Sequence, residues 1–114
     1  MKTFKNIAAQ GDLLIRRIET LPAGMNRVKN PTDGKLIVAH SETGHHHYLD
    51  VKDSVEYYMN PSDPNICFLR TEVPLNLIHA RPTHTHETIQ IPPGVFEFRR
   101  QQEYTPKGWR QVQD

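Results

Sequence analysis

The chain has 114 residues, of which 36% are hydrophobic and 24% are charged. A chain of this length forms one modest core, so we expect a single domain over residues 1–114. Fourteen basic and 13 acidic residues give a formal net charge of +1, which excludes a strong overall attraction to nucleic acid or to a membrane surface.

The single cysteine, Cys67, excludes an internal disulfide and is typical of a reducing compartment. It lies in the apolar run 66–69, where a buried and unreactive thiol is expected. No apolar segment approaches the ~20 residues that span a bilayer, and no signal peptide is visible. We therefore expect a cytoplasmic protein without a membrane partner.

The first ten residues predict a short helix or a flexible tail. Phe4, Ile7 and Ala8 have helical spacing, and Gly11 suits the end of a helix. Beyond Gly11, short runs of branched apolar residues alternate with turns that contain proline or glycine, a pattern typical of strands. The segments with strand character are 13–19, 35–40, 45–51, 54–59, 66–73, 75–79, 83–91, 95–102 and 109–112.

These segments predict an all-β fold with turns roughly every 8–12 residues and no long helix. We expect six to eight short, mostly antiparallel strands in a single compact barrel or sandwich. The segment 60–65 is predicted to stay outside any strand ladder, because Pro61 and Pro64 lack amide donors. The unbroken apolar run that follows it predicts a central strand over 66–73.

Histidines are concentrated in two segments of the chain. Four lie within residues 40–47 and three within residues 79–86; they are His40, His45, His46, His47, His79, His84 and His86. A His-x-His pair in a strand places both rings on one face, with Cβ atoms roughly 6.5–7 Å apart. Two such rings can bind one metal ion at about 2.0–2.1 Å from each nitrogen.

If the strands that carry the two His-x-His pairs lie side by side, they form a site for a divalent transition metal. The predicted ligands are His45, His47 and His86, with His84 or His40 assisting. Imidazole ligands suit Zn, Fe, Ni or Cu, and the sequence does not choose among these ions. A catalytic site, a structural site and simple solvated histidines all stay open, as does the question whether the protein is an enzyme.

Two resemblances accompany this pattern. His84-Thr85-His86-Glu87 followed by Pro92-Pro93-Gly94 resembles part of the first cupin motif, although Glu87 follows without the usual gap; the resemblance implies a β-barrel with a histidine site. Thr43-Gly44-His45-His46-His47 and Glu103-Tyr104-Thr105-Pro106 are similar to motifs of small uncharacterised proteins of phages and environmental bacteria. That similarity implies a compact β domain and no particular activity.

A second function class is a binding or assembly module without catalysis. The basic residues that could gather beside Tyr104 and Trp109 are Arg16, Arg17, Arg99, Arg100, Lys107 and Arg110. Such a cluster suits single-stranded nucleic acid, as in Sm-like or SH3-like barrels, while ordinary solvated arginines are the simpler interpretation. Exposed sheet edges favour a homo-oligomer, and clustered histidines could make its interface sensitive to pH.

Overall fold

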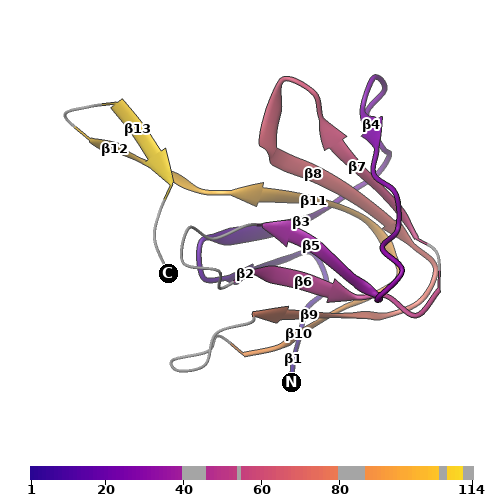
Figure 1. Cartoon of the computed structure of the whole chain (residues 1–114). Coiled ribbons are helices and arrows are strands. Elements are labelled where there is room, and N and C mark those ends of the chain that lie inside the picture. The colour runs from indigo at the N-terminus through magenta and orange to yellow at the C-terminus, as the bar shows by residue number, and fades with distance from the viewer. Residues whose placement is uncertain (40–45, 54, 80–86, 106–107, 112–114) are drawn as a thin grey trace.

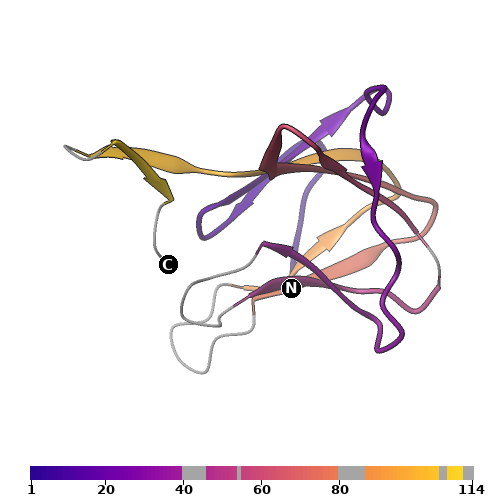
Figure 2. The ribbon, with the colours of Figure 1, turned by 45° about the horizontal axis from the view of Figure 1, so that its top comes forward.

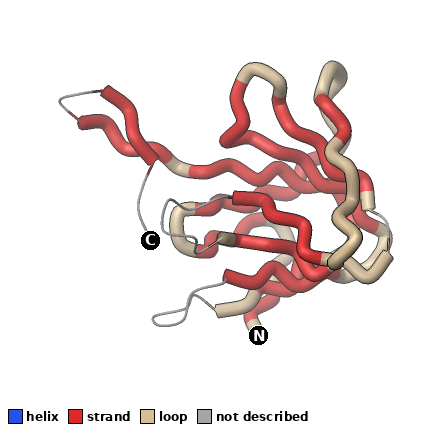
Figure 3. Tube along the Cα trace, in the orientation of Figure 1, coloured by secondary structure: helices blue, strands red, loops and turns tan. Residues whose placement is uncertain are grey.

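A computed structural model of the chain describes residues 1–39, 46–53, 55–79, 87–105 and 108–111. For residue 39 and for residues 102–105 and 108–111 it describes the backbone alone. All regular structure in these parts is strand, joined by turns and loops (Figure 3). No stretch of them forms a helix with the length and apolar character that crossing a membrane would require.

Two sheets face each other and form a sandwich (Figures 1 and 2). Sheet A has the order β1 (Lys2–Thr3), β10 (Ile89–Ile91), β9 (Leu75–His79), β6 (His47–Asp50), β5 (Lys35–Ala39). Sheet B has the order β2 (Ile7–Gln10), β3 (Leu13–Ile18), β11 (Gly94–Arg100), β8 (Asp63–Thr71), β7 (Glu56–Asn60), β4 (Asn26–Arg27). The hairpin of β12 (Gln102–Thr105) and β13 (Gly108–Gln111) follows β11 and extends away from both sheets in Figure 1.

The all-β prediction is confirmed. Of the two architectures expected, the structure has the sandwich and not the barrel. Each sheet keeps two open edges, β1 and β5 in sheet A and β2 and β4 in sheet B, so neither sheet closes on itself. Among the described residues, all strand pairs are antiparallel except β1 with β10. The strands outnumber the six to eight expected, because several are only two to four residues long.

The prediction of a helix or tail over residues 1–10 is wrong, since these residues form β1 and β2. In β2 the side chains alternate between exposed and buried, with Ala8 and Gln10 facing inward. This period of two fits a strand that covers a core. Pairing with β3, in which Ala8 lies opposite Ile15, overrides the weak helical spacing of the apolar residues.

The core lies between the sheets and is built from alternate positions of each strand. Its most deeply buried hydrophobic residues are Leu13, Ile15, Leu49, Tyr57, Leu69, Leu77, Ile89, Ile91, Phe96 and Phe98. Cys67 belongs to the same cluster, and burial raises the pKa of its thiol. The expectation of a buried, unreactive cysteine thus agrees with the structure.

The segment 60–65 departs from the prediction, because β8 already begins at Asp63. Asn60 pairs with Asp63 across the turn, after a shift of register between Met59 and Asn60. Pro64 lies next to this irregularity, at a position to which the registers with β7 and β11 assign no partner. The expectation for the following run is confirmed, since β8 lies inside sheet B between β11 and β7.

Two glycines with positive φ offer a matched test of the turn that leads into β5. Gly34 (φ 76°) and Gly24 (φ 79°) have nearly the same backbone conformation. A Cβ at Gly34 would lie 2.9 Å from the carbonyl oxygen of Val51, whereas a Cβ at Gly24 would meet no atom within 4 Å. Gly34 also accepts a hydrogen bond from the Val51 amide (2.7 Å).

We predict that Gly24→Ala lowers the free energy of unfolding by about 1–2 kcal/mol, the cost of the left-handed conformation alone. Gly34→Ala should cost distinctly more, because the methyl group also collides with backbone. Urea denaturation of both variants measures the difference. Equal losses would show that the Gly34–Val51 contact imposes no steric limit.

Candidate functional site

One end of sheet A is the place where the two histidine-bearing segments join the sandwich. β5 ends at Ala39, which lies opposite His47, the first residue of β6. His47 in turn lies opposite His79, the last residue of β9. Segments 40–45 and 80–86 therefore attach at neighbouring positions of the same sheet end, which we call the histidine end (Figure 1).

Of the five predicted metal ligands, the structure describes His47. The other four, His40, His45, His84 and His86, lie outside the described residues. The segment 45–51, predicted as a strand, contains β6, and the alternate residues His47, Leu49 and Val51 are all buried on the inner face.

His47 is almost completely buried and contacts two polar side chains of the β2–β3 hairpin. Its Nδ1 lies 2.8 Å from Oε1 of Gln10, and its Nε2 lies 3.3 Å from Oδ1 of Asp12. Gln10 uses its amide nitrogen to donate to the carbonyls of Leu77 and Glu87, both at 3.0 Å. Its oxygen is thus an acceptor, so the hydrogen-bond network assigns a proton to Nδ1 of His47.

Asp12 connects the histidine to a cation of sheet B. Its Oδ2 accepts a hydrogen bond from Nε of Arg100 at 2.7 Å, and both side chains are largely buried. Burial alone would raise the pKa of Asp12, but hydrogen bonds and charge from His47 and Arg100 outweigh it and lower the pKa from 3.8 to about 2. Asp12 is therefore a carboxylate at neutral pH, and it lies between His47 and Arg100.

A second imidazole packs on the first. The rings of His47 and His79 are parallel to within 3°, with centroids 4.2 Å apart, and His79 is 1% exposed. The two rings thus form a buried stack that closes the core at the histidine end. The sequence did not reveal this stack, because no local pattern established that β6 and β9 are neighbours.

Both ring nitrogens of His47 face polar side chains. A metal ligand must offer a nitrogen lone pair, but Nδ1 of His47 donates to Gln10 and Nε2 faces the carboxylate of Asp12. Within the parts of the chain that the structure describes, no group of three or more His, Cys, Asp or Glu side chains could hold a metal ion. The described contacts fix the position of His47 in the core.

The partners Gln10, Asp12 and Arg100 were not identified from the sequence. Gln10 and Asp12 flank Gly11, whose φ of 59° makes the tight turn between β2 and β3. Two polar residues on either side of a glycine look like an ordinary exposed turn. The signal that could have revealed Gln10 is the two-residue alternation of a strand, which places Gln10 on the same face as the buried Ala8.

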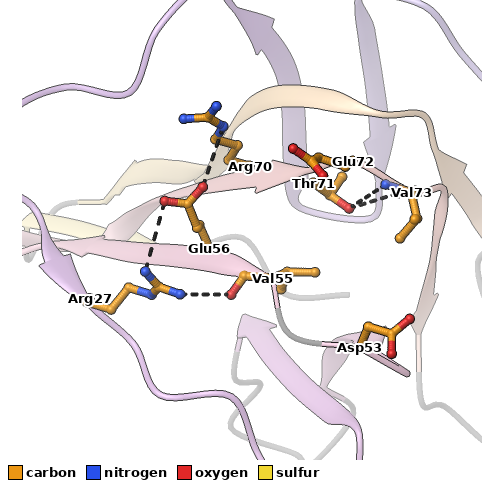
Figure 4. A pocket seen from close by; sticks show the side chains of 8 residues that line it. All are labelled: Arg27, Asp53, Val55, Glu56, Arg70, Thr71, Glu72 and Val73. Carbon is orange, nitrogen blue, oxygen red and sulfur yellow. Dashed lines mark hydrogen bonds and ion pairs between the residues drawn. The ribbon is translucent and has the colours of Figure 1, made fainter.

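A hollow of about 370 Å³ opens at the opposite end of the sandwich (Figure 4). Its lining residues are Arg27, Asp53, Val55, Glu56, Arg70, Thr71, Glu72 and Val73. Glu56 lies between two arginines, with Oε2 3.4 Å from Nε of Arg70 and Oε1 4.0 Å from Nη1 of Arg27. The volume suits a small polar ligand or part of a larger one.

The comparisons with known proteins identify a family. The model of a domain of unknown function, DUF8820, matches residues 9–101. The chain belongs to the DUF8820 family. The match runs from within β2 to the end of β11, so the DUF8820 domain contains Gln10, Asp12, His47, His79 and Arg100. Neither the curated proteins nor the solved structures gave a significant match.

Membership of this family agrees with the expectation of a small domain to which the resemblance assigns no particular activity. The description of the DUF8820 family names no substrate, cofactor or partner.

The lowered pKa of Asp12 makes stability depend on pH in a defined direction. A carboxyl group whose pKa is lower in the folded protein than in the unfolded chain stabilises the fold at any pH above its unfolded-state pKa. This stabilisation is lost as the pH falls to the folded-state pKa. For Asp12 this window runs from about 4 down to about 2. The contribution is on the order of 2 kcal/mol.

We predict that Asp12→Asn lowers the free energy of unfolding at pH 7 by at least about 2 kcal/mol, because Arg100 loses its buried partner. Between pH 4 and pH 2 the stability of the variant should also decline less than that of the unchanged protein. Urea denaturation across this range, with the exposed Asp50→Asn as control, measures both effects. Parallel pH profiles for Asp12→Asn and the unchanged protein would contradict the assignment.

Proposed function

We propose that the protein binds a divalent transition metal through histidines of segments 40–45 and 80–86. The ligands in this proposal are His45 and His86, with His84 or His40 completing the set. The observation that carries it is the adjacency of Ala39, His47 and His79, which brings the attachment points of both segments to one end of sheet A.

Chain connectivity supports the proposal. His45 is two residues from His47, and His86 is three residues from Ile89 at the start of β10. An extended chain covers ~3.3–3.6 Å per residue, and neighbouring strands lie ~4.8 Å apart. Because β9 alone separates β6 from β10, these chain lengths allow both histidines to reach one ion.

The buried network gives this end of the sheet the rigidity that a metal site needs. His47 is fixed by Gln10 and Asp12 and stacks on His79, so the strand ends next to both segments are held in place. Supporting contacts of this kind orient the ligands of a metal and raise its affinity. His47 therefore acts as a positioning residue in the proposed site.

Imidazole ligands suit Zn, Fe, Ni or Cu, and the proposal extends to this group of ions without choosing one. A carboxylate from Glu42 could complete the set. Glu87 is a weaker candidate, because its Oε1 lies 3.4 Å from the N-terminal ammonium of Met1.

We also infer a reducing, cytoplasmic location and a relationship to small proteins of phages and environmental bacteria. The first rests on the single buried thiol of Cys67, and the second on the motifs around His45 and Tyr104.

The test is the metal content of protein purified without a metal-affinity step. We predict about one transition-metal ion per chain, and loss of the ion in the double variant His45→Ala/His86→Ala. Titration of the metal-free protein with Zn²⁺ or Ni²⁺ should show affinity weakened by at least about 100-fold in that variant.

His46→Ala is the matched control, because His46 precedes β6 and is expected on the opposite face from His45 and His47. Its metal content should equal that of the unchanged protein. Substoichiometric metal that the double variant leaves unchanged would overturn the proposal.

A further inference from the structure

The outer face of sheet B presents arginines in excess over acids. Its outward positions alternate with the core positions: Phe68 and Arg70 alternate with Cys67 and Leu69 in β8. The charged residues at such positions are Arg16, Arg27, Arg70 and Arg99, with Glu56 and Glu97. At these strand positions four cations and two anions give a formal charge of +2. Glu72 and Asp53 lie at the edge of the face, in the lining of the hollow.

Each glutamate of this face lies between two arginines. Glu97 contacts Nη2 of Arg16 at 3.1 Å and Nε of Arg99 at 3.2 Å. Glu56 holds Arg27 and Arg70 in the same way, as Figure 4 shows. Every arginine thus gives part of its guanidinium to a carboxylate and keeps other N–H groups for a further anion.

The arginines are more exposed than the glutamates that hold them. Side-chain exposures are 50–55% for Arg16, Arg70 and Arg99 and 51% for Arg27. Glu97 is 11% exposed and Glu56 is 38% exposed. The positive groups therefore face outward and the negative groups lie recessed, so the face attracts anions despite its ion pairs.

A single row of paired residues crosses the face from Arg16 to Arg27. The register places Arg16 opposite Glu97, Glu97 opposite Phe68, Phe68 opposite Tyr58 and Tyr58 opposite Arg27. The row spans five strands, which is about 19 Å at the usual strand spacing. Phe68 is buried although it lies outside the core cluster, so its neighbours on this face cover it.

An aromatic ring and the hollow lie at the Arg27 end of the row. The guanidinium of Arg27 stands 5.5 Å from the centre of the half-buried Tyr58 ring, and the Tyr58 hydroxyl donates to Glu56 (3.1 Å). The hollow shares Arg27, Glu56 and Arg70 with the face and also contains the acidic side chains of Asp53 and Glu72. A partner that follows the arginines can thus place a planar group beside Tyr58, outside the hollow.

We propose that the outer face of sheet B binds single-stranded nucleic acid, with Arg16, Arg27, Arg70 and Arg99 contacting phosphates. Planar guanidinium groups match phosphate oxygens in pairs and also stack on bases. An acidic protein segment would satisfy the charge, but in a nucleic acid a planar base accompanies every phosphate and can lie beside Tyr58. This inference is independent of the metal site, which belongs to the other end of the sandwich.

The test is fluorescence anisotropy with labelled oligothymidylate and oligouridylate of about 15 nucleotides, in the presence of EDTA. We predict micromolar binding of at least one probe at about 50 mM salt, with log K falling against log salt with a slope of up to about −2.8, since four phosphate contacts contribute ~0.7 each.

The decisive variant is Arg70→Gln/Arg99→Gln, which removes one arginine beside each glutamate and leaves Arg16 and Arg27 to pair with Glu97 and Glu56. It should reduce the slope to about −1.4 and the affinity at low salt about tenfold. Glu56→Gln should strengthen binding, because it removes a negative charge while Arg27 and Arg70 remain.

Lys35→Gln is the matched control. Lys35 also lies beside an aromatic ring, with Nζ 5.7 Å from the centre of Tyr48, but it belongs to sheet A. Its removal should leave the affinity unchanged. Absence of binding to both probes at about 50 mM salt, equal losses for the control and the double variant, or binding of polyglutamate in place of the oligonucleotides would overturn the proposal.

Discussion

The pairing of the two sheets depends on one buried carboxylate. Asp12 lies between Arg100 of sheet B and His47 of sheet A, where an isolated charge would cost several kcal/mol in desolvation. The cost is offset only when both partners are in place, so the β2–β3 turn, the end of β11 and the start of β6 must assemble together. Gln10 adds bonds from the same turn to the carbonyls of Leu77 and Glu87.

The polar contacts of the β2–β3 turn also fix the register of β2, which the apolar core alone defines less strictly. A slip of β2 by one residue would turn Gln10 outward and leave its polar contacts with sheet A unmade. The core itself tolerates exchanges among residues of similar volume. The polar network thus specifies how the sheets meet, while the apolar residues supply most of the stabilising burial.

Sequence reasoning was most accurate where a local period decides the structure. The alternation in β6 places His47, Leu49 and Val51 inward, and the apolar run after Pro64 identifies an interior strand. It was wrong over residues 1–10, where the partner strand and not the local spacing decides. The choice between barrel and sandwich, the stack of His47 on His79 and the role of Asp12 all depend on which strands become neighbours, and no local pattern contains that information.

The basic residues show how strand geometry divides a cluster that the sequence presents as one. Arg99 and Arg100 are adjacent, yet Arg99 lies on the outer face beside Glu97 while Arg100 points to the buried Asp12. Arg16 and Arg17 divide similarly, since Arg17 donates to backbone carbonyls of Lys5 and Pro93. In each pair one arginine stabilises the fold and the other remains on the surface. The excess charge available to a partner therefore comes from strands far apart in sequence, β3, β4, β8 and β11, whose arginines meet only when sheet B has formed.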